Sequence, residues 1–146
     1  MSVITLLDTN ILIDLAVAGP WQTWSAAAFT HVLEAGGVAI NPVIFCELAK
    51  NYHRAEDLEA AYPRETFQRL DLPWNACFIA GQAHLRYREA GGRRDRTLPD
   101  FLIGAHASVS GLTLATRDAH RYRSYFPELR LIEPGTHHRE LVPEGG

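Results

Sequence analysis

The sequence predicts an α/β protein whose parallel sheet is covered by helices on both faces. Short apolar runs alternate with segments of helical periodicity along most of the chain. The first run, residues 3–7, is almost unbroken, as is typical of a strand buried on both faces. It ends abruptly at Asp8, where polar residues suit the start of a helix. Repeated strand-to-helix transitions of this kind indicate parallel strands.

The first third of the chain shows this alternation most clearly. Asn41 and Pro42 have the character of an N-cap followed by a first helical residue. We expect strands at 3–7 and 38–40, and helices at 11–18, from Trp21 to Gly36, and at 43–53.

The remainder is expected to continue the pattern. We expect helices at 55–62, 64–70, 75–90 and 97–110 and one that begins at Asp118, with strands at 70–72, 112–115 and 129–132. Residues 1–133 are predicted to form one domain, and residues 134–146 a flexible polar tail.

The bulk properties set limits on the class of protein. A chain of 146 residues can bury a core as one domain. No apolar run approaches the ~20 residues that cross a bilayer, and the start lacks the basic region of a signal peptide, so we expect a cytoplasmic protein without a membrane partner. Cys46 and Cys77 stand in apolar contexts, which favours buried, reduced thiols. The net charge of −3 gives little support for nucleic-acid binding by itself.

Four acidic residues occupy positions that the predicted topology would bring to one end of the molecule. Asp8 follows the first strand, Asp118 follows the strand at 112–115, and Glu47 lies in the helix after residues 38–40. Asp100 lies in the first turn of a helix that enters from the same edge. Ligands of open parallel sheets bind beyond the carboxyl ends of the strands.

Each acid alone has a structural explanation. Asp8 and Asp118 could cap helices, Asp100 could complement a helix dipole, and Glu47 could pair with Lys50 on one helix face. Taken together, clustered carboxylates repel one another, and a cation removes that cost. Oxygen ligands without Cys or His at fixed spacing suit Mg²⁺ or Mn²⁺ better than zinc. Such ions commonly serve phosphoryl transfer, so these residues predict a metal-dependent site that acts on phosphate esters.

At these residues the chain resembles the PIN-domain ribonucleases, and most closely the VapC-type toxins of bacterial toxin–antitoxin pairs. The resemblance covers roughly residues 4–133 and rests on four motifs in matching order: LDTNIL at 7–12, CELA at 46–49, PDFLIGAHA at 99–107 and LATRD at 114–118. It implies a three-layer α/β/α sandwich with a five-stranded parallel sheet. It also implies endonucleolytic cleavage of structured RNA that leaves a 5′-phosphate, and neutralisation by a small antitoxin protein. We also expect a homodimer.

The resemblance assigns roles residue by residue. Asp8 and Asp100 match the metal ligands, Asp118 completes the site, and Glu47 either binds the Mg²⁺ or Mn²⁺ ion or orients the attacking water. Thr116 either supports a ligand or water through its hydroxyl or is simply a β-branched strand residue. Many relatives carry Asn where this chain has Arg117, so the substrate contacts of that loop do not transfer.

Several other side chains have competing interpretations. Arg93 and Arg94 precede Asp100 and, with Arg117, are hypothesised to contact the RNA backbone; the alternative is a solvated loop. His106 lies inside an apolar helix, which favours a hydrogen-bonded structural histidine over a catalytic one. The aromatic side chains of the second helix are expected to pack in the core, or else to frame a groove for a partner helix: Trp21, Trp24 and Phe29.

Two other functions would use parts of the same pattern. A phosphatase of the haloacid dehalogenase group would use Asp8 as nucleophile, but it would carry a second acid where this chain has Asn10. The other rival is a catalytically silent PIN-like module that binds RNA or a protein partner. The presence of all four acids speaks against it, and metal-dependent stabilisation without RNA cleavage would favour it.

Overall fold

One parallel sheet of five short strands organises the molecule. The computed structural model describes residues 3–92 and 95–135. The strand order is β3-β2-β1-β4-β5, and every pair of neighbours is parallel. The strands are β1 (Thr5–Leu7), β2 (Val38–Ile40), β3 (Phe67–Arg69), β4 (Thr113–Ala115) and β5 (Leu131–Ile132). The predicted α/β class with a parallel sheet is therefore confirmed, and β1 lies at its centre.

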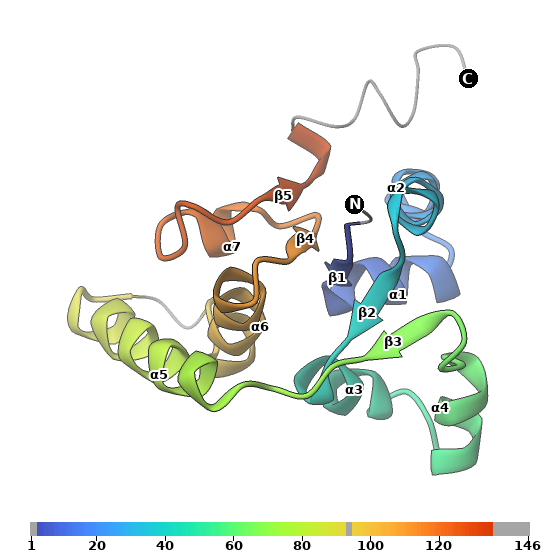
Figure 1. Cartoon of the computed structure of the whole chain (residues 1–146), viewed down its shortest axis with the longest axis horizontal. Helices are drawn as coiled ribbons and strands as arrows, with labels where there is room; N and C mark the ends of the chain where they lie inside the picture. Colours follow the sequence, from blue (N-terminus) through green and yellow to red (C-terminus); the bar gives the residue numbers. More distant parts are fainter. Residues whose placement is uncertain (1–2, 93–94, 136–146) are drawn as a thin grey trace.

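Helices cover both faces of this sheet. In Figure 1, α1 and α2 lie on one side of the strands, and α5 and α6 lie on the other. The helices are α1 (Thr9–Ala16), α2 (Gln22–Ala35), α3 (Pro42–Ala49), α4 (Ala55–Ala61), α5 (Trp74–Glu89), α6 (Leu98–Val109) and α7 (His120–Arg123). The arrangement is the expected α/β/α sandwich.

The buried faces explain why the central strands are nearly continuous apolar runs. All three residues of β1, of β2 and of β4 are buried, because helices press on both faces of each strand. The Asn41 side chain accepts a hydrogen bond from the Ile44 backbone N–H (2.9 Å), which confirms the predicted N-cap of α3. Its amide Nδ2 lies 3.0 Å from Nδ1 of buried His106, which therefore has the structural partner that was expected.

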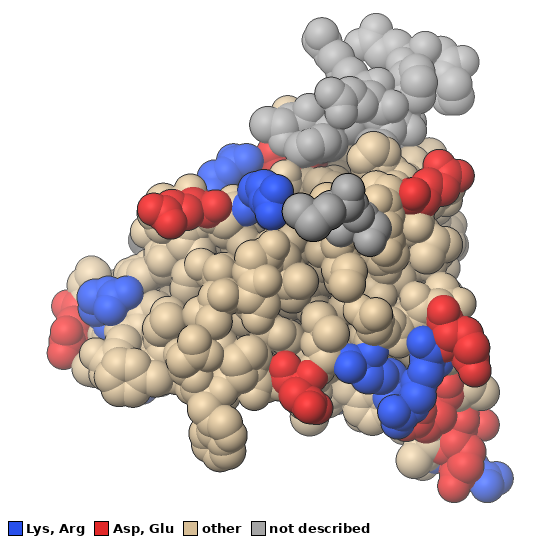
Figure 2. Space-filling model, viewed as in Figure 1, with Lys and Arg blue, Asp and Glu red and all other residues tan. Residues whose placement is uncertain are grey.

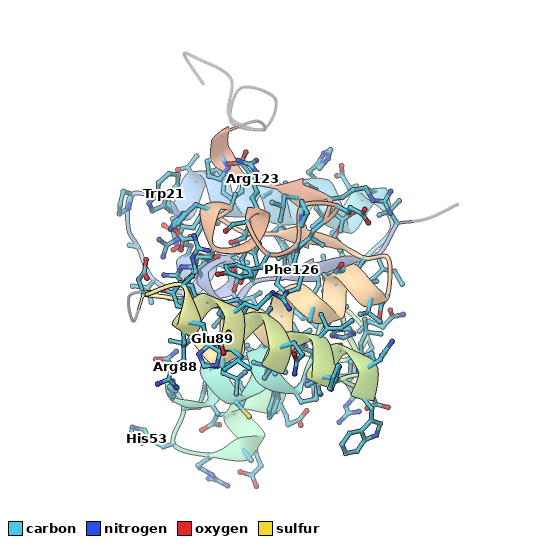
Figure 3. All side chains as sticks on the ribbon, turned by 90° about the vertical axis from the view of Figure 1, so that its left-hand side faces the viewer. Trp21, His53, Arg88, Glu89, Arg123 and Phe126 are labelled. Atoms are coloured by element: carbon cyan, nitrogen blue, oxygen red, sulfur yellow. The ribbon has the colours of Figure 1, made fainter. Side chains whose placement is uncertain are left out.

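A glycine allows α7 to approach α6 closely. A Cβ at Gly104 would lie 2.6 Å from Cε2 of Phe126 and 2.9 Å from Cδ1 of Tyr122. The side chains of Tyr122 and Phe126 are both buried against α6. Figure 3 shows Phe126 lying between α7 and the helices beneath it. Close packing at Gly104 thus fixes the position of α7.

The predicted helix at 64–70 and the predicted strand at 70–72 are wrong. The strand is β3, Phe67–Arg69, whose residues pair in parallel with Val38, Ala39 and Ile40. Phe67 is buried and stacks on Phe29 at 5.7 Å between ring centroids, while Gln68 faces solvent. Pairing with β2 and this tertiary contact decide the conformation of a segment whose local sequence favours neither state.

The aromatic side chains of α2 and of the turn before it are not all buried in the core, although core packing was one of the two predictions for them. Trp24 is buried and Phe29 packs against the core, but Trp21 is 37% exposed and lies at the margin of the molecule (Figure 3). Cys46 is exposed and Cys77 partly exposed, so the predicted burial of the thiols is wrong for Cys46, although both are free. The inward face of α3 is taken by Ile44 and Leu48, which leaves Cys46 on the outside.

The remaining predictions concern the start of the last helix, membrane-spanning segments and the C-terminal tail. Helix α7 begins at His120, two residues beyond the expected start at Asp118. Within the described ranges, no helix is long and apolar enough to cross a membrane. The predicted tail, from residue 136 onward, lies outside the described residues.

Candidate functional site

The adjacent strands β1 and β4 bring Asp8 and Asp118 to the same edge of the sheet. Asp8 follows the last residue of β1, and Asp118 lies three residues beyond the end of β4. Two side chains connect them: the Thr116 hydroxyl donates to Asp8 Oδ2 (2.8 Å), and Asn10 Nδ2 donates to Asp118 Oδ2 (3.1 Å). The topology therefore gathers these two acids, as predicted from their places after the strands.

Asp8 is a buried carboxylate that is held by hydroxyl groups. It is 4% exposed, and its Oδ2 accepts hydrogen bonds from the Tyr122 hydroxyl (2.7 Å) and the Thr116 hydroxyl (2.8 Å). Burial raises the pKa of the Asp8 carboxyl from 3.8 to about 6; the two hydroxyl donors oppose this rise, and the charges of Asp100 and Glu47 add to it. Burial also raises the pKa of Tyr122 well above its ordinary value, so this hydroxyl remains a donor.

Glu47 reaches the site from α3. Its Oε1 accepts a hydrogen bond from the hydroxyl of Thr9 (2.7 Å), the residue that follows Asp8. Among the ion pairs of the described residues, none joins Glu47 to Lys50, so the structural explanation for this acid does not hold there. Its charge contributes to the raised pKa of Asp8, which places the two acids in electrostatic contact.

Asp100 has both a structural role and a place in the site. Its Oδ2 accepts from the backbone N–H of Thr97 (2.9 Å) and from the Thr97 hydroxyl (3.2 Å), within a capping box at the start of α6. Its other oxygen, Oδ1, lies 3.5 Å from Nη1 of Arg121. Asp100 therefore lies in the first turn of α6, where an acid was expected to complement the helix dipole, and one of its oxygens is engaged there.

The two acids that were given capping explanations do not cap helices. Asp8 occupies the N-cap position of α1 but makes no side-chain capping hydrogen bond. The N-cap of α7 is Ala119, one residue after Asp118. Both carboxylates instead accept hydrogen bonds from side chains of other segments.

Arg121 lies against two acids of this edge. Its Nη1 faces Asp100 Oδ1, and its Nη2 lies 3.8 Å from Asp118 Oδ2. Burial opposes the charge of Arg121, but the negative charges of Asp100, Asp118 and Asp8 favour it, and the pKa of Arg121 is raised. One guanidinium thus lies between two of the predicted metal ligands.

The donor set suits a hard divalent ion by its chemistry. The four side chains offer carboxylate oxygens, which Mg²⁺ and Mn²⁺ prefer. In residues 3–92 and 95–135, however, no three His, Cys, Asp or Glu side chains are already gathered closely enough to hold a metal. Asp100 and Asp118 therefore lie against Arg121, and the acids of the described residues do not form a closed cage.

The residues that were hypothesised to contact RNA lie in different settings. Arg117 Nε donates to Asp14 Oδ2 (2.9 Å) in an ion pair that fixes the loop after β4 to α1. Thr116 serves Asp8 through its hydroxyl and also accepts from the backbone N–H of Asp118 (3.0 Å). Arg93 and Arg94 lie outside the described residues.

Sequence reasoning missed several side chains that shape the site. Thr9, Asn10 and Tyr122 each bond to one of the four acids. Thr9 and Asn10 belong to the motif around Asp8, so their proximity to it was a usable signal. Tyr122 gave no local signal, because its contact with Asp8 depends on the packing of α7 against α6.

The fold and the acidic edge define an α/β protein with a candidate site for a hard metal ion. The model of the PIN domain family matches residues 5–126, and the chain belongs to this family. The PIN-domain resemblance predicted from the sequence motifs is therefore confirmed.

Solved structures similar in fold include several toxin–antitoxin complexes. VapBC2 from Rickettsia felis bound to a promoter DNA fragment has 19% identity and a TM-score of 0.67, over 89% of this chain and 98% of that one. VapBC-1 from nontypeable Haemophilus influenzae has 21% identity and a TM-score of 0.68, over 89% and 97%. A toxin–antitoxin complex from Klebsiella pneumoniae has 29% identity and a TM-score of 0.56, over 89% and 97%. A search of curated proteins found no match.

Proposed function

We propose that the chain is a metal-dependent endoribonuclease and the VapC-type toxin of a toxin–antitoxin pair. Membership in the PIN-domain family and the fold shared with VapBC complexes support this class of function. The observation that carries the proposal is that acids from separate segments share partners at one edge of the sheet. Asn10 donates to both Asp8 and Asp118, and Arg121 lies against both Asp118 and Asp100.

Each acid has a role that follows from its surroundings. Asp8, Asp100 and Asp118 would hold Mg²⁺ or Mn²⁺, which would supply a water of lowered pKa and stabilise charge on the scissile phosphate. Glu47 would bind the ion or orient the attacking water through the oxygen that Thr9 leaves free. Thr116 and Tyr122 would hold the Asp8 carboxylate in a fixed orientation through their hydroxyl groups.

The substrate contacts would come from basic residues. Arg93 and Arg94, which precede Asp100 in the sequence, would contact the RNA backbone. Arg117 would act less directly, since its ion pair with Asp14 already engages it. Arg96 offers a further cation shortly before Asp100 in the sequence: it lies over the ring of Tyr87 at 5.6 Å and donates to Ser124 Oγ (2.8 Å).

A small antitoxin protein would bind the helical hairpin of α1 and α2. Apolar side chains are exposed along the end of α1 and in the turn that leads to α2: Ile13, Val17 and Trp21, with exposed fractions of 37%, 61% and 37%. Exposed apolar side chains of this kind suit the apolar face of a partner helix or an extended apolar segment. The solved relatives in fold are complexes of a toxin with its antitoxin, which supports such a partner.

A second copy of the chain would dock on α5. Trp74, Phe78 and Leu85 lie along this helix and are 91%, 69% and 50% exposed. Figure 2 shows that much of the surface over α5 carries no charged side chain. Gly81 lies between them with open space beside it, so a partner helix could approach closely. A homodimer formed in the cytoplasm would cover these side chains.

Incubation of the purified protein with total RNA tests the proposed activity. We expect cleavage products with 5′-phosphate ends in Mn²⁺ or Mg²⁺ and none in EDTA. Asp8→Asn should lower the rate at least ~100-fold, whereas Asp57→Asn, the same change at an exposed position of α4, should leave it unchanged. Full activity of Asp8→Asn, or cleavage that persists in EDTA, would contradict the proposal. Stabilisation by Mn²⁺ without cleavage would instead favour a silent binding module.

A further inference from the structure

The position of Arg121 among the acids is the starting point. This residue is the second of α7, and its two terminal nitrogens face acids from different segments: Asp100 at the start of α6 (3.5 Å) and Asp118 in the loop after β4 (3.8 Å). Among the ion pairs of the described residues, every one that reaches Asp8, Glu47, Asp100 or Asp118 comes from Arg121. This one guanidinium therefore supplies the local compensation for two negative charges, those of Asp100 and Asp118.

The contacts of Arg121 are looser than those of the arginines beside it. Arg117 Nε donates to Asp14 at 2.9 Å, and Arg123 Nη2 donates to Glu133 at 3.0 Å, both within hydrogen-bond distance. Arg121 is held at 3.5 and 3.8 Å, by charge more than by directed hydrogen bonds. Its side chain is 36% exposed, so a path to solvent is open. Such a guanidinium can leave without breaking a short bond.

A divalent ion and Arg121 would compete for the same oxygens. Mg²⁺ requires carboxylate oxygens at about 2.1 Å, much closer than a guanidinium needs. Asp100 Oδ1 and Asp118 Oδ2 cannot close around an ion while Nη1 and Nη2 lie against them. The two cations would also repel each other at this distance.

We propose that Arg121 is the resident counter-ion of the acidic site, which a divalent ion displaces from Asp100 and Asp118, so that Arg121 lowers the metal affinity of this chain. The inference rests on the proposed function, since it assumes that these acids are metal ligands. Arg121 thereby stabilises the metal-free protein and weakens binding of the metal. It is a positioning residue, because it acts through the two carboxylates.

Calorimetric titration with Mn²⁺ tests the effect on affinity. Arg121→Gln should bind Mn²⁺ about tenfold more tightly than the unchanged protein, and its melting temperature should fall in EDTA but not in saturating Mn²⁺. The matched control is Arg123→Gln, a change two residues away whose partner is Glu133; Figure 3 shows Arg123 at the outer edge of the molecule. This control should leave the Mn²⁺ affinity unchanged. Unchanged or weaker binding by Arg121→Gln would overturn the inference.

Two further measurements separate displacement from a general effect of charge. Arg121→Lys keeps the charge but loses the forked donor. Its Mn²⁺ affinity should lie between that of the unchanged protein and that of Arg121→Gln.

In NMR spectra of arginine Nε–H groups, Mg²⁺ should shift the Arg121 signal and leave that of Arg117 in place. An unmoved Arg121 signal in Mg²⁺-bound protein would contradict displacement. If no variant binds Mn²⁺, the proposed metal site itself fails; equal binding by all variants defeats this inference while leaving that site intact.

Discussion

Two buried aspartates at opposite ends of α1 are held in different ways. Asp14 is 9% exposed, and its Oδ2 accepts from the Ser25 hydroxyl (2.7 Å) and from Nε of Arg117 (2.9 Å). Asp8 is 4% exposed, and its Oδ2 accepts from hydroxyl groups and, at 3.4 Å, from the Asn10 amide. No cation pairs with Asp8 among the ion pairs of the described residues. Asp14 therefore has its charge compensated within the fold, and Asp8 does not.

This difference separates a structural acid from a reactive one. The Asp14 cluster ties α1, α2 and the loop after β4 together, and it needs no external ion. Asp8 keeps an uncompensated charge in a buried position, which costs free energy in the metal-free protein and favours a cation that comes from outside. The comparison predicts opposite effects of the same substitution at the two positions.

The largest expected effect is a loss of stability in Asp14→Asn. The change leaves Arg117, whose side chain is 29% exposed, without its carboxylate partner. We expect the free energy of unfolding to fall by about 3 kcal/mol, as for other broken buried pairs, with Mn²⁺ affinity per folded molecule little changed. Urea denaturation in EDTA measures this effect. If Asp14→Asn were as stable as the unchanged protein, the ion pair of Asp14 would not distinguish it from Asp8.

Asp8→Asn should act in the opposite direction. In EDTA at pH 7.5 we expect unfolding to cost up to ~3 kcal/mol more than in the unchanged protein, because a buried negative charge is gone. The gain should disappear in Mn²⁺, which stabilises the unchanged protein but not this variant. Equal melting temperatures in EDTA would show that the Asp8 charge is already compensated in the metal-free fold.

The pH dependence sharpens the same comparison. The folded-state pKa of Asp8 is raised to about 6 from 3.8. Between these pH values the folded protein holds a proton on Asp8 that the unfolded chain has lost. The free-energy cost of the buried Asp8 charge therefore grows as pH rises through this window. The stability advantage of Asp8→Asn in EDTA should therefore be full above pH 6 and shrink by about half at pH 5. Denaturation midpoints of both proteins at several pH values measure it. An advantage that stays constant from pH 5 to pH 7.5 would contradict the assignment to Asp8.

The hydroxyl donors provide a smaller test. Thr116→Val removes a donor to Asp8 at nearly constant volume, and we expect Mn²⁺ affinity to fall about tenfold, as for other residues that orient metal ligands. The matched change at the structural acid is Ser25→Ala, which should lower stability by about 1 kcal/mol and leave Mn²⁺ affinity unchanged. The comparison fails if Ser25→Ala lowers the Mn²⁺ affinity as much as Thr116→Val does.

The sequence predicted the sheet edge better than it predicted the contacts made there. Asp8 and Asp118 were placed correctly because each follows a buried strand and parallel strands end at one edge. The strand at Phe67–Arg69 was missed, since its pairing with β2 and its packing on Phe29 lie outside any local window. Arg117 was expected to face a substrate, but its partner Asp14 is far away in the sequence.

The hydroxyl of Tyr122 illustrates the limit for the site. Its bond to Asp8 spans 114 positions in the sequence and depends on the close approach of α7 to α6 at Gly104. The motif around Asp8 identifies an acid of interest, but the groups that tune its pKa come from a helix whose position only tertiary packing determines. Residue types and spacing therefore predicted the acids, and not the environment that distinguishes Asp8 from Asp14.

Anomalous scattering from crystals soaked in Mn²⁺ tests the central claim most directly. We expect a strong peak bounded by the carboxylates of Asp8, Asp100 and Asp118, with the guanidinium of Arg121 moved away from it, and no such peak in Asp8→Asn crystals. Soaked crystals with no peak at this edge of the sheet, or with Mn²⁺ bound elsewhere while Arg121 still contacts Asp100 and Asp118, would contradict the assignment of these acids as a metal site.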